Sequence, residues 1–150
     1  MNPEMKALYQ EMILDHYKKP RNFHALNNQT HEAKGHNPLC GDRVTVYLVL
    51  DGNTVKDIGF QGTGCAISTA SASMMTDFIK GKTIDEIEHL FSAFHDLVTL
   101  EKPLANQDKL GKLKVFEGVR EFPMRVKCAT LSWHTLKAAL NEKDQPTSTE

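Results

Sequence analysis

A β-hairpin is the feature that most constrains how this chain can fold. Residues 43–50 alternate apolar and polar side chains, Asp51-Gly52 follows, and residues 55–61 form a second short strand-like run. Alternation with a period of two is typical of a half-buried strand, and Asp-Gly between two such runs favours a tight turn. The sequence therefore predicts two antiparallel strands whose outer ends lie side by side.

Cysteines stand just outside both ends of this hairpin. Cys40 precedes the first strand in the stretch Asn37-Pro38-Leu39-Cys40-Gly41-Asp42, and Cys65 follows the second strand after Gly62-Thr63-Gly64. We expect the hairpin to bring the two cysteines to the same end of the sheet. If the Cys-Gly-Asp segment is extended, the side chains of Cys40 and Asp42 point to the same face.

The other cysteine surroundings favour ionised thiols. Cys65 is expected at the N-terminus of a small-residue helix over residues 66–80, where the partial positive charge of the helix lowers a thiol pKa. Cys128 falls in the first turns of a helix opened by Pro123, and Arg125 lies three residues before it on the same predicted face. A cation beside a thiol stabilises its thiolate.

These residues raise the hypothesis of a shared metal site. Three thiolates and the Asp42 carboxylate make a plausible four-coordinate donor set for zinc. The alternative is that the three cysteines are buried small apolar side chains. Their number is odd and no Cys-x-x-Cys pair occurs, which argues against a disulfide framework or a thioredoxin-like redox role. Convergence at one end of the sheet favours the metal site.

The remaining elements are mostly helical. The further expected elements are a helix from Asn2-Pro3 to Lys19, an edge strand near 30–35, a helix after the capping box 83–86, a loop over 98–111, a short helix near 110–119 and a last helix from Pro123 to about Leu140.

Length and charge limit the class of protein. The 150 residues suggest a single domain over 1–150, with a polar, flexible tail from about 141 to 150. The net charge of -1 gives no strong field for nucleic acid or an anionic membrane. No apolar run is long enough to span a membrane, and the first residues lack the regions of a signal peptide. A cytoplasmic location with reduced thiols is expected.

Three motifs together resemble a known family. The stretch 37–42, the stretch Gly62-x-Gly64-Cys65-x-Ile67-Ser68 and the stretch 125–133, Arg-x-Lys-Cys-Ala-Thr-Leu-Ser-Trp, look like the IscU/SufU iron–sulfur cluster assembly family. The resemblance runs from about Leu8 to Leu140. It implies an α+β fold with a small antiparallel sheet of about three strands packed against several helices. It also implies that the metal ligands are Cys40, Asp42, Cys65 and Cys128, with Arg125 close by.

The SufU branch is the more similar one. The IscU branch has a histidine immediately before its last cysteine, where this chain has Lys127, and a Leu-Pro-Pro-Val-Lys chaperone motif, where this chain has residues 122–126 as Phe-Pro-Met-Arg-Val. The longer gap between Cys65 and Cys128 also resembles SufU. This branch implies a Zn²⁺-containing protein that accepts sulfur from a pyridoxal-phosphate (PLP) cysteine desulfurase. The acceptor then passes the sulfur to downstream iron–sulfur assembly proteins.

The favoured hypothesis is therefore sulfur transfer. Cys40 is predicted to attack the desulfurase persulfide, because Gly41 and the preceding loop give it freedom. Arg125 is predicted either to hold the freed thiolate by charge or to anchor the partner. Cys65 and Cys128, anchored at helix starts, suit permanent metal ligands. One alternative is an iron–sulfur cluster scaffold that uses the same four ligands for a transient cluster. A second is a structural zinc module, although Asp42 is unusual among structural ligands.

Overall fold

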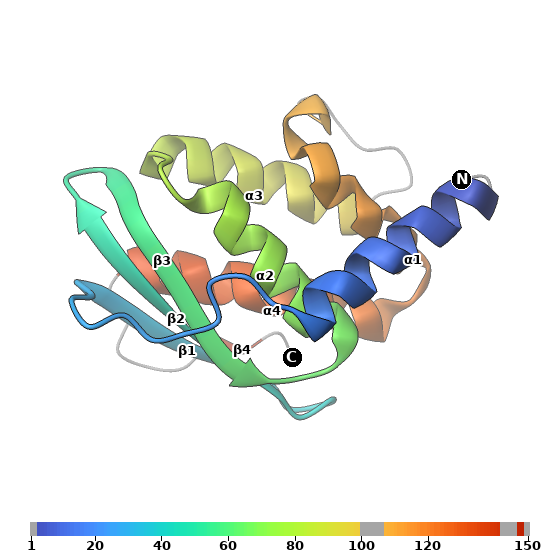
Figure 1. Cartoon of the computed structure of the whole chain (residues 1–150), viewed down its shortest axis with the longest axis horizontal. Coiled ribbons are helices and arrows are strands. Elements are labelled where there is room, and N and C mark those ends of the chain that lie inside the picture. The colour runs from blue at the N-terminus through green and yellow to red at the C-terminus, as the bar shows by residue number, and fades with distance from the viewer. Residues whose placement is uncertain (1–2, 100–106, 142–146, 149–150) are drawn as a thin grey trace.

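The computed structural model describes residues 3–99, 107–141 and 147–148, which form a mainly antiparallel sheet with helices packed on one side (Figure 1). This arrangement confirms the predicted α+β class. In chain order the elements are α1 (Pro3–Lys18), β1 (His31–Asn37), β2 (Asp42–Asp51), β3 (Thr54–Thr63), α2 (Ala66–Ile79), α3 (Ile84–Thr99), the 3-10 helix η1 (Gln107–Glu121), α4 (Pro123–Leu140) and β4 (Thr147–Ser148).

The sheet has the strand order β3-β2-β1-β4. The predicted hairpin is confirmed, because β2 and β3 pair antiparallel and Asp51 lies opposite Thr54 across a two-residue turn. Gly52 in this turn has a φ of 61°, a left-handed conformation that glycine adopts without strain. The short β4 pairs parallel with β1, with Thr147 opposite Gly35, and lies within the segment that we expected to be a flexible tail.

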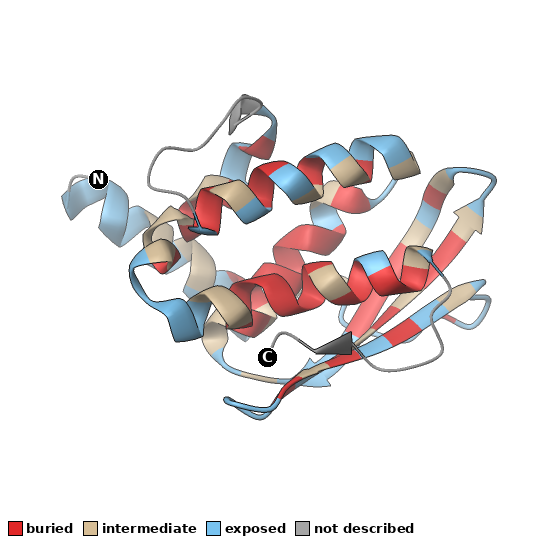
Figure 2. Ribbon diagram, turned by 180° about the vertical axis from the view of Figure 1, so that it is seen from behind, coloured by how far each residue is buried: buried red, intermediate tan, exposed pale blue. Residues whose placement is uncertain are grey.

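The helices α2 and α4 lie closest to the sheet and to each other. Every second residue of β2 from Asp42 to Leu48, among them Val46, is buried. The small residues 70–73 of α2 are all buried, which lets the two helices approach closely. Ser71 uses this proximity, because its Oγ donates a hydrogen bond to Ala129 O at 2.6 Å and accepts one from Trp133 Nε1 at 3.2 Å. Figure 2 shows the buried side of α4 along the sheet.

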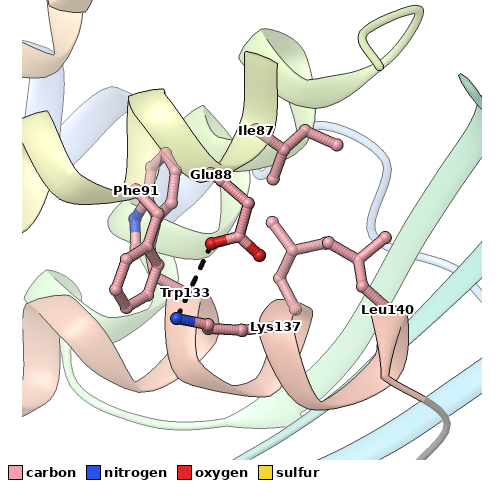
Figure 3. Close-up of a pocket in the computed structure, with 7 residues that line it drawn as sticks. Ile87, Glu88, Phe91, Trp133, Lys137 and Leu140 are labelled. Atoms are coloured by element: carbon pink, nitrogen blue, oxygen red, sulfur yellow. Dashed lines mark ion pairs between the residues drawn. The ribbon is translucent and has the colours of Figure 1, made fainter. Parts of the chain in front are cut away.

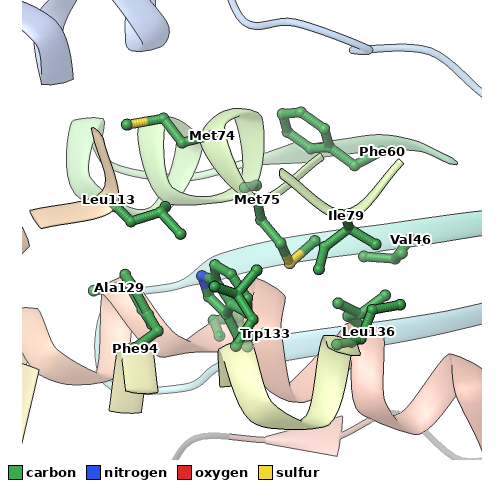
Figure 4. Close-up of a cluster of buried hydrophobic side chains, with 14 of the residues drawn as sticks. Val46, Phe60, Met74, Met75, Ile79, Phe94, Leu113, Ala129, Trp133 and Leu136 are labelled. Carbon is green, nitrogen blue, oxygen red and sulfur yellow. The ribbon is translucent and has the colours of Figure 1, made fainter. Parts of the chain in front are cut away.

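Trp133 lies at the centre of the core and joins α4 to α3 (Figure 4). Its ring is fully buried and stacks on Phe94 with 4.6 Å between ring centroids. Met75 of α2 lies against the opposite side of the same cluster. The start of α4, and with it Cys128, is therefore fixed by packing that continues along the whole helix.

The helix α3 covers α4 on the side away from the sheet. Its predicted capping box is confirmed, because Glu86 N donates to Thr83 Oγ1 at 3.2 Å and Thr83 N donates to Glu86 Oε1 at 3.1 Å. Further along, Lys137 of α4 pairs with Glu88 at 3.6 Å beside Phe91 (Figure 3).

The predicted loop over residues 98–111 is wrong at both of its ends. The helix α3 continues to Thr99, and η1 begins at Gln107 with a kink at Gly111. Val98 is fully buried, so packing extends the helix beyond its local sequence signal. Residues 100–106 lie outside the described part of the chain.

The first helix is anchored to α2 by a buried polar contact. His16 Nδ1 lies 2.7 Å from Ser73 Oγ, and the same oxygen accepts a hydrogen bond from Arg21 N just after the helix. Among the helices that the structure describes, none has the length and apolar character needed to cross a membrane.

Candidate metal and sulfur site

A tight turn between β1 and β2 presents Cys40. Asn37 O accepts hydrogen bonds from Cys40 N at 3.2 Å and Gly41 N at 2.8 Å, and Asn37 Oδ1 accepts one from Leu39 N at 3.2 Å. Gly41 has a φ of 73°, which favours glycine over residues with a Cβ. The extended conformation considered for residues 40–42 is therefore wrong, and the strand begins at Asp42.

The turn nevertheless brings three predicted ligands together. One ligand atom from each of Cys40, Asp42 and Cys128 lies within 4.8 Å of the other two. The sulfur atoms of Cys40 and Cys128 are 3.5 Å apart. Asp42 and Cys128 are only 2% and 3% exposed, whereas Cys40 is exposed. In this group, Asp42 and Cys128 are thus buried, and the Cys40 thiol is open to solvent.

Asp42 connects this group to the start of α2. Its Oδ1 accepts a hydrogen bond from Cys65 N at 3.0 Å, and its Oδ2 lies 3.8 Å from Cys65 Sγ. A Cβ on Gly64 would lie 3.1 Å from Asp42 Oδ1 and 3.0 Å from Ser68 Oγ. Gly64 therefore leaves the room that the Asp42 carboxylate needs to reach the helix end.

Cys65 lies at the helix N-terminus, as predicted, but its sulfur is outside the three-residue group. Cys65 is the N-cap of α2, and its Sγ accepts a hydrogen bond from Ser68 N at 3.4 Å. A sulfur atom so placed satisfies one of the free N–H groups of the first turn. We expected Cys40 and Cys65 to lie at the same end of the sheet. Asp42, two residues after Cys40, contacts Cys65 directly there.

Arg125 lies at the exposed start of α4. Its guanidinium carbon is 4.9 Å from the centroid of the Phe122 ring. The residue also lines a groove of about 130 Å³ that Lys6, Tyr9 and Ile13 of α1 border on the other side. The side chain thus faces Phe122 and α1, and its predicted action on the Cys128 thiolate stays a prediction.

The site's electrostatics fit a bound cation. Burial, followed by the hydrogen bonds with Asp42 and Cys40, raises the pKa of Cys128. The negative charge of a Cys128 thiolate is therefore unfavourable in this place without a compensating positive charge. Zn²⁺ binds a combination of cysteine sulfur and carboxylate oxygen ligands, and thiolates also bind iron.

Asn37 is a site residue whose role was not predicted from the sequence. It is fully buried at the end of β1, and its Nδ2 donates a hydrogen bond to Cys128 Sγ at 3.9 Å. One side chain therefore holds the Cys40 turn and contacts the Cys128 sulfur. The available signal was Asn-Pro directly before the turn, because asparagine side chains often bond to the backbone two residues later.

We expect Asn37→Ala to destabilise the protein by about 1–3 kcal/mol, because it leaves Leu39 N and Cys128 without their partner. For a chain of this size this corresponds to a fall in the thermal midpoint of roughly 2–4 °C per kcal/mol. Thermal melting followed by circular dichroism measures the change. Asn28→Ala, at an exposed position, is the matched control, and equal midpoints for the two variants would contradict the role of Asn37.

The site's residues lie within a region that matches a known family. Residues 8–142 match the family described as NifU-like N terminal domain. The chain is 42% identical over 143 residues to the zinc-dependent sulfurtransferase SufU of Bacillus subtilis (strain 168), covering 95% of this chain and 96% of the relative. It is 38% identical to the iron-sulfur cluster assembly scaffold protein IscU of Streptococcus pyogenes serotype M1, covering 91% and 85% of the two chains.

A solved structure has the same fold. A putative iron-sulfur cluster assembly scaffold protein for the SUF system from Fervidobacterium islandicum AW-1 superposes with a TM-score of 0.83. The two sequences are 37% identical, and the match covers 89% of this chain and 97% of the other. The relatives thus include both sulfurtransferase and scaffold names.

Proposed function

We propose a sulfur-acceptor function, on the premise that the chain belongs to the NifU-like N-terminal domain family, in its IscU/SufU group of iron–sulfur cluster assembly proteins. In this proposal a PLP-dependent cysteine desulfurase is the sulfur donor, and downstream iron–sulfur assembly proteins are the recipients. The observation that carries the proposal is the exposed Cys40 thiol beside the buried Cys128 and Asp42.

Cys40, Asp42 and Cys128 would hold a zinc ion, with Cys65 as the fourth ligand. Rotation of the Cys65 side chain would exchange its bond from Ser68 N for a metal bond, and Asp42 already links the two. The chemistry that bound zinc supplies is positive charge, which keeps the coordinating thiols ionised at neutral pH.

Cys40 is the proposed acceptor of sulfur. Its thiolate attacks the outer sulfur of the desulfurase persulfide, a new sulfur–sulfur bond forms on Cys40, and the desulfurase thiolate leaves. The exposed turn allows this approach, whereas Cys128 is buried. Arg125, in the groove that α1 borders, is well placed to bind the partner surface, and this position favours an anchoring role over direct contact with the thiolate.

A second candidate is a scaffold on which an iron–sulfur cluster is assembled. It is favoured by the same donor group, because thiolates bind iron as well as zinc, and by the IscU name of the Streptococcus pyogenes relative. A purely structural zinc module fits less well, because Asp42 is among the donors and Cys40 is exposed.

Metal analysis of aerobically purified protein, together with its visible absorption spectrum, separates these functions. One zinc per chain and no colour favours sulfur transfer, whereas bound iron with sulfide bands favours the scaffold. Incubation with desulfurase and radiolabelled cysteine then tests the transfer itself. A protein with zinc that neither accepts label nor stimulates the desulfurase would overturn the proposed function.

We expect Asp42→Ala to weaken stimulation of the desulfurase without emptying the site. Loss of the carboxylate leaves three thiols that can still bind zinc, but it also removes the bond that holds Cys65 N. Zinc content and desulfurase turnover are measured on the variant. Asp51→Ala, at the exposed end of β2, is the control, and wild-type values for both quantities in Asp42→Ala would remove Asp42 from the site.

A further inference from the structure

Two of the site's thiols are in direct contact although they come from distant parts of the chain. Cys40 Sγ, in the turn before β2, lies 3.5 Å from Cys128 Sγ, in α4. Cys40 is exposed, and Cys128 is 3% exposed. If one sulfur of such a pair carries a further sulfur, the thiolate of the other can attack it, and a redox-active cysteine often has a resolving cysteine beside it.

We propose that Cys128 resolves a persulfide on Cys40 and that the chain thereby releases the transferred sulfur as hydrosulfide. This inference rests on the proposed function, in which Cys40 receives the sulfur. The Cys128 Sγ–Cys40 Sγ bond forms, and the bond from Cys40 Sγ to the outer sulfur breaks. Cys128 attacks as the thiolate, after giving up its bond to zinc where zinc is bound, and the outer sulfur leaves as HS⁻ with its own proton. The two cysteines supply the two electrons, so the step needs no other reductant.

The geometry favours attack on the inner sulfur of the persulfide. Cys128 Sγ approaches Cys40 Sγ from the buried side, and the outer sulfur has room on the solvent side, because Cys40 is exposed. Thiol–disulfide exchange requires that the attacking sulfur and the leaving sulfur lie on opposite sides of the sulfur atom under attack. Attack on the outer sulfur would move it to Cys128 and release nothing.

The remaining cysteine is less suited to this role. Cys65 Sγ accepts a hydrogen bond from Ser68 N and contacts Asp42 Oδ2, and it lies outside the group that contains Cys40 and Cys128. For the pair itself, a disulfide of about 2.05 Å requires the two sulfur atoms to approach further. The turn that carries Cys40 and Gly41 is exposed, so core packing does not oppose a shift of Cys40 towards Cys128.

Chemical loading tests the step without the desulfurase. The full chain is treated with inorganic polysulfide, desalted at acidic pH to stop exchange, and returned to neutral pH. Released sulfide is measured colorimetrically, and peptides are mapped by mass spectrometry without reductant. We expect the Cys40 persulfide to disappear while one sulfide and one Cys40–Cys128 disulfide form per persulfide lost. We expect Cys128→Ser to keep its persulfide, and Cys65→Ser still to form the disulfide.

The time course of the wild-type chain is decisive even if Cys128→Ser folds poorly. Sulfide release without the disulfide, a persulfide that moves to Cys128, or a persulfide that persists on Cys40 would each overturn the inference. A chain that resolves the polysulfide-derived persulfide but takes no label from the desulfurase would overturn only the proposed function. Label on Cys40 without resolution would overturn only the role of Cys128.

Discussion

Replacing Cys40 by alanine is expected to abolish sulfur transfer from the desulfurase to this chain. Cys40 is an exposed thiol in the turn before β2, and Cys128 beside it is buried. Asp42, Cys65 and Cys128 remain to bind zinc, and the turn remains held by Asn37, so the variant should still fold and dock. Radiolabelled cysteine with desulfurase measures transfer, and gel filtration with the desulfurase measures docking.

The control for this variant is Leu39→Ala, which changes an exposed side chain in the same turn but keeps the thiol. It should accept label as the wild type does. Label that persists on Cys40→Ala and that thiols remove would show another acceptor. A variant that no longer docks would instead place Cys40 in the binding surface, and the transfer result would then be read from Cys40→Ser.

Removing zinc is expected to lower the thermal midpoint by about 8–16 °C. The site clamps the turn before β2, the start of α2 and the first turns of α4, so the binding free energy of a metal contributes to folding. A ligand at 1,000 times its dissociation constant stabilises a protein by about 4 kcal/mol. Each kcal/mol shifts the midpoint of a chain of this size by roughly 2–4 °C.

The measurement is a melting curve before and after chelation, with the metal content determined for both samples. Cys128→Ser serves as the control, because it removes the buried thiol that we propose as the metal ligand from α4. Its midpoint should respond less to the chelator than that of the wild type. An unchanged wild-type midpoint after verified removal of zinc would contradict a role of the metal in folding.

Much of the fold follows from signals that act over a few residues. Asp51-Gly52 between two alternating runs was sufficient for the hairpin, and Thr83 with Glu86 was sufficient for the start of α3. Glycines before Cys65 correctly placed this cysteine at a helix N-terminus. Such features are encoded locally because turns and caps depend on the backbone preferences of adjacent residues.

The chemistry of the site was also visible in the sequence, but only as a set of residue types. Three thiols, one carboxylate and their motifs indicated the family and a shared metal site. The structure brings Cys40, Asp42 and Cys128 together and leaves Cys65 at its cap. The sequence could not distinguish these positions, because the competition between a helix cap and a metal bond depends on side-chain rotation.

The contact between Cys40 and Cys128 was decided by tertiary structure alone, since 88 residues separate them. It exists because α4 packs along the sheet and under α3 through Trp133, and because Asn37 ends β1 inside the core. The short β4 beside β1 is likewise a long-range pairing. The sequence by itself determined the local elements and the reactive groups, whereas the packing of distant segments decided which sulfur atoms meet, because that depends on the whole core at once.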